Sequence, residues 1–187
     1  MAVQFYDEMH NTLGGGEVRE HYQPMDSWLG EQTAEHLANK RQQADLMFHK
    51  LGITFAVYGE ETGTERLIPF DIIPRVFPKS EWQALEKGLR QRVLTLNLFL
   101  HDVYHEQKII KAGIIPAERI FANAQYRPEM QGVDVARQVY SHISGVDIVR
   151  AGEGEFYVLE DNLRVPSGVS YMMEDRKMMM RLFPDLF

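Results

Sequence analysis

Three oxygen-bearing side chains stand among apolar residues in the segment 145–171, and their spacing would let them act together. Asp147 lies before a glycine-rich turn, and Glu160 and Asn162 lie after it. The apolar residues around the turn predict two strands, whose side chains alternate between two faces. Asp147, Glu160 and Asn162 share one face of this hairpin when the turn contains an even number of residues.

The length of the turn therefore decides the arrangement. A two-residue turn at 153–154 places Asp147 directly opposite Glu160, and a four-residue turn at 151–154 places it one diagonal step away. A three-residue turn would put the two carboxylates on opposite faces. We expect an even-numbered turn.

Two carboxylates held this close repel each other unless a cation lies between them. Carboxylate and amide oxygens are hard ligands, which suit Mg²⁺ or Mn²⁺, and these ions complete their shells with water and phosphate oxygens. The alternative is an exposed sheet face on which Asp147, Glu160 and Asn162 bind nothing. Two features favour the metal site: apolar residues flank the acids, and Arg164 follows two residues after Asn162.

The residues after the hairpin could serve the same site. In an extended chain Arg164 points to the side of Asn162, where a guanidinium would neutralise charge on a transferring phosphoryl group. The alternative for Arg164 is a salt bridge to Glu160 or Asp161. The backbone N–H groups of Ser167-Gly168 could bind an anion at a helix N-terminus, although ordinary helix capping explains these two residues equally well.

The same residues carry a resemblance to a known family. The segment Tyr157–Tyr171, with its Glu-Asp-Asn run and the arginine behind it, resembles the Glu-x-Asn signature of ATP-grasp enzymes. It is more closely similar to the circularly permuted ATP-grasp family, which is related to glutathionylspermidine synthetase. Four segments upstream agree with that family, and they are 5–9, 52–58, 96–102 and 126–130.

The resemblance implies an ATP-dependent carboxylate–amine ligase, which forms an acyl phosphate that an amine then attacks to give an amide. It implies that ATP and Mg²⁺ (or Mn²⁺) are the cofactors, with Asp147, Glu160 and Asn162 as the metal ligands. It also implies that Arg164 assists phosphoryl transfer. Arg127, with Glu129 beside it, is a cofactor or substrate contact through the resemblance alone.

Members of the family are considerably longer than this chain of 187 residues. We therefore expect 1–187 to form a single domain, the N-terminal portion of a longer circularly permuted protein. In this interpretation 1–30 is a poorly periodic lead-in, and 139–182 contains the hairpin and the helix after it. A C-terminal lobe beyond the chain would complete the nucleotide site and would be its partner.

The composition restricts the other function classes. A net charge of −7 argues against a nucleic-acid partner, which would favour a basic surface. The chain has no cysteine, so it has neither a disulfide nor a thiolate nucleophile. No signal-peptide pattern follows Met1 and no apolar run reaches membrane-spanning length, so we expect a cytoplasmic protein without a membrane partner.

Periodicity and capping signals predict an α/β or α+β fold, with helices packed on a mainly antiparallel sheet that carries the metal site. The clearest helix begins at Ser80, with Trp82, Leu85 and Val103 among the residues of its buried stripe. The remaining elements are helices at 33–50, 106–111, 116–121 and 170–182, and strands at 53–58, 66–70, 139–150 and 155–162.

Two other function classes stay open. The first is a non-catalytic binding or scaffold domain of the same fold, in which the acids are structural hydrogen-bond partners. The second is a zinc hydrolase that uses His101 and His105, which share a helix face. Asp102 occupies the place that a metalloprotease helix gives to glutamate, and no third ligand is evident. We therefore expect both histidines to be structural.

Overall fold

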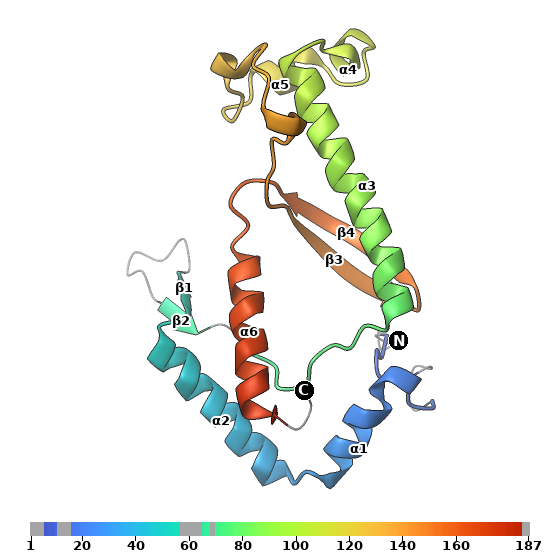
Figure 1. Cartoon of the computed structure of the whole chain (residues 1–187), viewed down its shortest axis with the longest axis vertical. Coiled ribbons are helices and arrows are strands. Elements are labelled where there is room, and N and C mark those ends of the chain that lie inside the picture. The colour runs from blue at the N-terminus through green and yellow to red at the C-terminus, as the bar shows by residue number, and fades with distance from the viewer. Residues whose placement is uncertain (1–5, 11–15, 57–64, 68–69, 185–187) are drawn as a thin grey trace, which may run out of the picture. The chain divides into compact units, whose positions relative to one another are not determined.

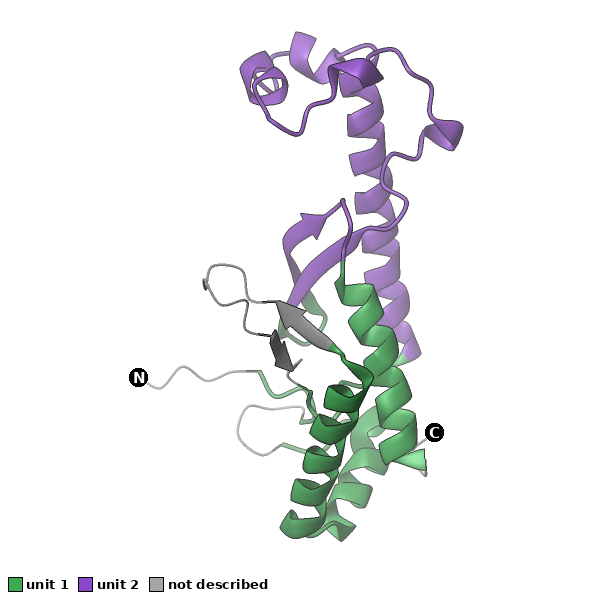
Figure 2. Ribbon diagram, turned by 90° about the vertical axis from the view of Figure 1, so that its left-hand side faces the viewer, with its two compact units in different colours: residues 1–78, 150–155, 167–187 green, residues 79–149, 156–166 purple. Residues whose placement is uncertain are grey.

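The computed structural model describes residues 6–10, 16–56, 65–67 and 70–184 (Figure 1). Contacts divide the chain into two compact units (Figure 2). Unit 1 comprises Met1–Pro78, Arg150–Glu155 and Ser167–Phe187, and unit 2 comprises Lys79–Val149 and Phe156–Pro166. The single domain expected from the sequence stays a prediction.

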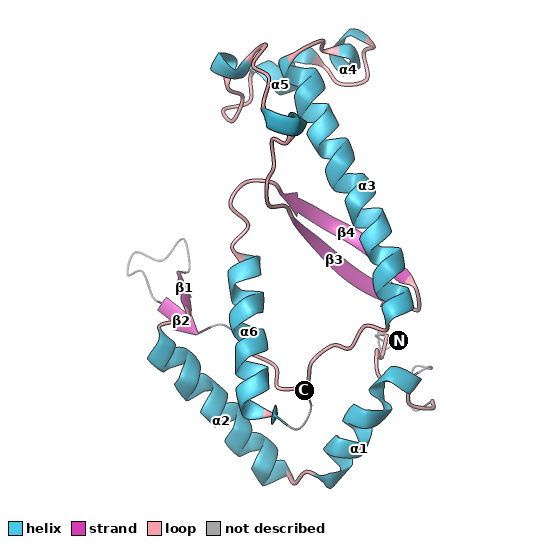
Figure 3. Ribbon diagram, in the orientation of Figure 1, coloured by secondary structure: helices cyan, strands magenta, loops and turns pink. Residues whose placement is uncertain are grey.

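Helices and two small antiparallel sheets make up the described structure, which confirms the mixed fold class (Figure 3). In unit 1 the elements are η1 (Glu20–Tyr22), α1 (Gln23–Glu31), α2 (Ala34–Leu51), β1 (Thr54–Ala56), β2 (Glu65–Leu67) and α6 (Gly168–Leu182). The prediction of a poorly periodic lead-in missed α1, a short helix with a proline in its first turn. Only one side chain of α1, that of Met25, is buried, and no side-chain capping hydrogen bond marks the start of this helix.

Local signals define α2 well. The Thr33 hydroxyl caps its first turn by accepting the backbone N–H of His36 at 3.1 Å. Gly52 ends the helix with a φ of 65°, a conformation that glycine adopts without steric cost. The predicted helix is thus confirmed. The hairpin predicted after it is present as β1 and β2, and the parts at 57–64 and 68–69 lie outside the described residues.

The core of unit 1 lies between α2 and α6, which pack against each other (Figure 1). Met178 and Met179 of α6 are buried there, whereas the side chain of Met180 is 48% exposed because it lies on the other side of the helix. Lys40 donates a hydrogen bond to the Leu182 carbonyl at 2.7 Å. The buried cluster consists of Ala44, Phe48, Ile72, Met178, Met179, Leu182 and Phe183.

Unit 2 contains the long helix that positions the predicted site. Its elements are α3 (Lys79–Tyr104), α4 (Lys108–Lys111), α5 (Ala117–Phe121), η2 (Pro128–Met130), η3 (Ala136–Gln138), and most of β3 (Gly145–Gly152) and β4 (Glu155–Asn162). Leu85 and Val103 of the predicted stripe are buried. Trp82 is 50% exposed, so its prediction as a core residue is wrong.

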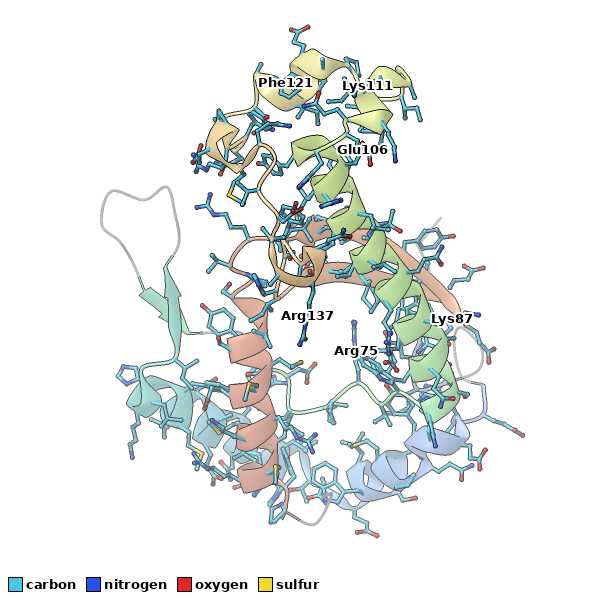
Figure 4. All side chains as sticks on the ribbon, turned by 45° about the horizontal axis from the view of Figure 1, so that its top comes forward. Arg75, Lys87, Glu106, Lys111, Phe121 and Arg137 are labelled. Carbon is cyan, nitrogen blue, oxygen red and sulfur yellow. The ribbon has the colours of Figure 1, made fainter. Side chains whose placement is uncertain are left out.

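The C-terminal end of α3 organises the segment that follows it. The Tyr104 ring stacks on that of Tyr126, with centroids 5.4 Å apart. The Tyr104 carbonyl accepts the backbone N–H of Gly132 at 2.7 Å. Lys111 of α4 donates a hydrogen bond to the Glu106 carbonyl at 2.6 Å. Both residues are labelled in Figure 4.

The first strand of the central hairpin is shorter than the sequence predicts. It was expected from Val139, but β3 begins at Gly145. Asn97 explains the difference, because its side-chain oxygen accepts the backbone N–H groups of Tyr140 and Ser141 at 2.8 and 3.0 Å. These two groups therefore bond to α3, and a strand ladder cannot use them.

No helix within the described ranges is both long and apolar enough to cross a lipid bilayer.

Candidate functional site

The hairpin turn contains two residues. β3 ends at Gly152 and β4 begins at Glu155, and Gly154 between them has a φ of 69°. A methyl group placed on Gly152 would lie 3.7 Å from Cβ of Glu155, and one placed on Gly145 would lie 3.5 Å from Cβ of Asn162. Both ends of the hairpin therefore indicate the same register.

In this register Asp147 lies opposite Glu160, and Asn162 projects from the same face as Glu160. The side chains of Asp147 and Glu160 are exposed, and that of Asn162 is half-buried. Asn162 donates a hydrogen bond from Nδ2 to Glu160 Oε1 at 3.2 Å. The three groups thus lie on one face of the hairpin, and their role as metal ligands stays a prediction.

The chemistry of this donor set fits Mg²⁺ or Mn²⁺, because two carboxylates and an amide oxygen are all hard ligands. In the described part of the chain, no three His, Asp or Glu side chains converge on one point. That finding does not bear on Asp147, Glu160 and Asn162, whose third donor is an amide.

Asp161 projects from the opposite face of β4, where Arg92 of α3 binds it in a bidentate ion pair. Nε of Arg92 lies 2.7 Å from Oδ1 and Nη2 lies 2.6 Å from Oδ2. The Arg92 hydrogen bonds lower the pKa of the Asp161 carboxyl group below its ordinary value, against the smaller raising effect of burial. Both oxygens of Asp161 are thus engaged away from the face of Glu160 and Asn162.

Arg164 binds a neutral partner. Its Nη1 donates to the side-chain oxygen of Gln125 at 2.7 Å. Of the two acids expected as alternative partners, Glu160 and Asp161, the second pairs with Arg92 instead. The guanidinium of Arg164 is exposed, and this hydrogen bond leaves its charge uncompensated.

The other predicted contacts lie in separate places. Arg127 precedes η2, its side chain is exposed, and its backbone N–H donates to the Tyr104 hydroxyl at 3.2 Å. In unit 1, Ser167 and Gly168 lie at the start of α6. The Ser167 side chain makes no capping hydrogen bond, which removes ordinary side-chain capping as an explanation for it.

Sequence reasoning missed the residues that support the hairpin. Ser141 is buried, and its hydroxyl donates to the Leu163 carbonyl at 3.1 Å, just beyond β4. A methyl group on Gly145 would lie 2.7 Å from Cβ of Pro166, so Gly145 leaves the space in which Pro166 packs. A glycine inside the predicted strand 139–150 is the one local signal that could have indicated this close approach.

His101 and His105 make hydrogen bonds within unit 2. Their rings stack with centroids 4.1 Å apart. The Nδ1 atom of His105 lies 2.9 Å from the His101 carbonyl, and its Nε2 atom lies 3.1 Å from Asp134. Nδ1 of His101 lies 3.2 Å from the Tyr140 hydroxyl. Both nitrogens of His105 are therefore engaged, which favours the structural role over zinc binding.

Asp102, between the two histidines, caps the next helix. Its carboxylate accepts the backbone N–H groups of Lys108 and Ile109 at 2.8 and 2.9 Å. Burial raises the pKa of Asp102, but the two backbone hydrogen bonds and the nearby charges of Lys108 and Lys111 together lower it overall. This carboxylate therefore stabilises the start of α4 and is not placed as a catalytic base.

Comparison with known proteins identifies the family. Residues 74–187 match the model of a family described as a circularly permuted ATPgrasp. This chain belongs to that family. The match includes α3, the whole hairpin and α6, and therefore every residue predicted for the site.

Several longer proteins are similar to this ATP-grasp chain over almost its whole length. An uncharacterized protein of Synechocystis sp. is 43% identical over 98% of the chain, and one of Mycobacterium leprae is 39% identical over 97%. A Frankia alni protein named putative glutamate–cysteine ligase 2-3 is 37% identical over 97% of the chain. The chain spans 38%, 31% and 20% of these three relatives, respectively.

Proposed function

We propose that this chain supplies the Mg²⁺-binding hairpin of an ATP-dependent carboxylate–amine ligase. The observation that carries the proposal is the register of the hairpin, which has Asp147 opposite Glu160 and Asn162 on the same face. Membership of the ATP-grasp family supports it. The names of the Frankia relatives point to the same reaction class, because joining glutamate to cysteine forms an amide.

In this proposal Asp147, Glu160 and Asn162 hold the metal ion. Bound Mg²⁺ would neutralise part of the negative charge on the phosphates of ATP. Two carboxylates and one amide leave about half of an octahedral shell for water and phosphate oxygens. The three side chains alone therefore bind the ion weakly, and nucleotide and metal stabilise each other in the site.

Arg164 provides positive charge for phosphoryl transfer. Its hydrogen bond to the neutral Gln125 amide leaves the guanidinium with a full charge that an anion can use. Transfer of a phosphoryl group to a carboxylate spreads negative charge over the transferring oxygens, and a fixed cation stabilises that distribution. The backbone N–H groups of Ser167-Gly168 and the Arg127 side chain are the proposed further contacts to the nucleotide.

The proposal includes a lobe that this chain does not contain. The similar proteins are longer than the chain, and a second lobe would enclose the adenine and ribose. In this interpretation the chain is the N-terminal portion of a relative of glutathionylspermidine synthetase, working in the cytoplasm where ATP is available. The apolar part of nucleotide binding would then depend on the second lobe.

Calorimetry tests this proposal. Mg–ATP is titrated into the 187-residue chain and into a version extended with the C-terminal region of a longer relative. We expect weak binding by the chain and saturable binding by the extended form. The double variant Glu160→Ala/Asn162→Ala should abolish the latter. A matched control, Glu153→Gln, changes an exposed acid in the turn of the same hairpin and should leave binding intact.

Binding by the extended form that is indifferent to the loss of Glu160 and Asn162 would contradict the metal-site proposal. The hydrogen bond between these two residues favours one alternative, a scaffold domain in which they are structural partners. That alternative predicts that the double variant loses stability and that no variant changes metal or nucleotide binding.

A further inference from the structure

We propose that Arg92 is a positioning residue of the metal site: by binding Asp161 on one face of β4, it holds Glu160 and Asn162 on the other. This inference rests on the proposed function, because it concerns the same site. Nothing in the motif itself indicates Arg92, which lies 69 residues before Asp161 in the chain.

The geometry of the ion pair constrains β4 more than a single contact would. Two parallel hydrogen bonds of 2.7 and 2.6 Å join the planar guanidinium of Arg92 to both oxygens of Asp161. Such a pair sets the orientation of the carboxylate as well as its distance. The Asp161 side chain is 15% exposed and that of Arg92 is 43% exposed, so the carboxylate is the better shielded of the two partners.

Asp161 stands between the two predicted ligands on the same strand. Because adjacent side chains of a strand point to opposite faces, fixing Asp161 fixes the directions of Glu160 and Asn162 as well. A rotation of the strand end that turned Asp161 away from α3 would also turn these two away from Asp147. The pair therefore acts on the ligands through the backbone, without touching the metal.

A second contact from α3 holds Leu163, the residue directly after β4. Asn97 is buried and binds the backbone N–H of Ser141, whose hydroxyl donates to the Leu163 carbonyl. Asn97 lies five residues after Arg92 on α3, so one rigid helix holds the strand end at two points. Arg92 is the anchor that acts directly on a side chain of the Glu-Asp-Asn run.

The sign of the charge effect allows a sharp test. Removing the positive charge of Arg92 lowers the repulsion on a nearby cation and frees the carboxylate of Asp161, so electrostatics alone predicts tighter metal binding. Loss of positioning predicts weaker binding instead. Supporting residues of this kind change metal affinity by roughly 10- to 100-fold.

The experiment uses Mn²⁺ as a paramagnetic probe on the ¹⁵N-labelled chain. Manganese chloride is titrated while backbone amide signals are recorded, and nearby amides broaden even when binding is weak. In the wild-type chain we expect selective broadening at Asp147, Glu160 and Asn162. In Arg92→Gln we expect the apparent affinity to fall roughly 10-fold or more, with the selectivity lost.

Three further variants separate geometry from charge. Arg92→Lys keeps the charge without the bidentate fork and should bind Mn²⁺ with intermediate affinity. Asp161→Asn should behave like Arg92→Gln, and combining the two should add little, because both break one interaction. Arg90→Gln is the matched control: Arg90 lies on the same helix, pairs with Glu86 and should leave Mn²⁺ affinity unchanged.

Melting curves of each variant accompany the titrations, and the outcomes are distinct. If Mn²⁺ causes no selective broadening in the wild-type chain, the proposed metal site and this inference are both wrong. Selective wild-type broadening with equal or tighter binding by Arg92→Gln overturns the role of Arg92 alone. A lower melting temperature with unchanged Mn²⁺ affinity also overturns it, because Arg92 would then be merely structural.

Discussion

The side-chain amide of Asn162 donates a hydrogen bond to the carboxylate of Glu160, with Nδ2 and Oε1 3.2 Å apart. This bond aligns two residues of the same face of β4. It uses the donor of the amide, so the Asn162 side-chain oxygen is left to accept from water or to bind a cation. The pair thus places side-chain oxygens of both residues on the face that Asp147 also occupies.

Glu160→Gln tests whether the charge at this position serves metal binding. Glutamine keeps an oxygen that accepts from Asn162, so the free energy of unfolding should change by less than about 0.5 kcal/mol. Affinity for Mg–ATP in the extended form should fall at least roughly tenfold, because a ligand charge is lost. Urea unfolding and calorimetry measure the two quantities. Unchanged Mg–ATP affinity would exclude Glu160 as a ligand.

Asn97→Ala should be strongly destabilising. The side-chain oxygen of Asn97 accepts two backbone hydrogen bonds, from Tyr140 and Ser141, and the variant leaves both donors without that partner. We expect a loss of roughly 2–3 kcal/mol in the free energy of unfolding, measured in urea. Thr95→Ala on the same helix removes an exposed hydroxyl and should stay within about 0.5 kcal/mol. A loss as small as that of the control would be inconsistent with the role given to Asn97.

The ion pair between Arg92 and Asp161 predicts a specific dependence of stability on pH. The pKa of Asp161 is lowered below the ordinary value of 3.8, so the folded state favours its charged form. Its stabilising contribution is present above that ordinary value and is lost as the pH falls through the lowered pKa of the folded state. Unfolding free energies of the wild type and Asp161→Asn between about pH 6 and pH 2 should therefore converge at the acidic end. A gap that stays constant over this range would argue against the assignment.

His101 and His105 should not bind zinc. Both nitrogens of His105 already have partners in the His101 carbonyl and Asp134, and a metal ion would have to displace one of them. Protein purified without added metal should contain zinc well below one equivalent by elemental analysis. The variant His101→Ala/His105→Ala should contain the same amount. Stoichiometric zinc that disappears in this variant would revive the hydrolase hypothesis.

The sequence by itself determined the elements whose signals are local. Thr33 caps α2 as predicted, because a capping hydroxyl and the N–H that it binds lie only three residues apart. The shared face of Asp147 and Glu160 could be predicted in the same way, since an even-numbered turn and a side-chain period of two are local features. The choice between a two-residue and a four-residue turn came from the structure, in which β3 ends at Gly152 and β4 begins at Glu155. For the same reason the motif of the ATP-grasp family was recognisable before any coordinates.

Only the tertiary structure decided which distant residues support that hairpin. Arg92 binds Asp161 across 69 residues of sequence, and Arg164 binds Gln125 across 39. Asn97 shortens β3 by taking two N–H groups that a strand pattern would have used. These interactions depend on where α3 passes in space, and a short-range pattern of residue types carries no information about that path.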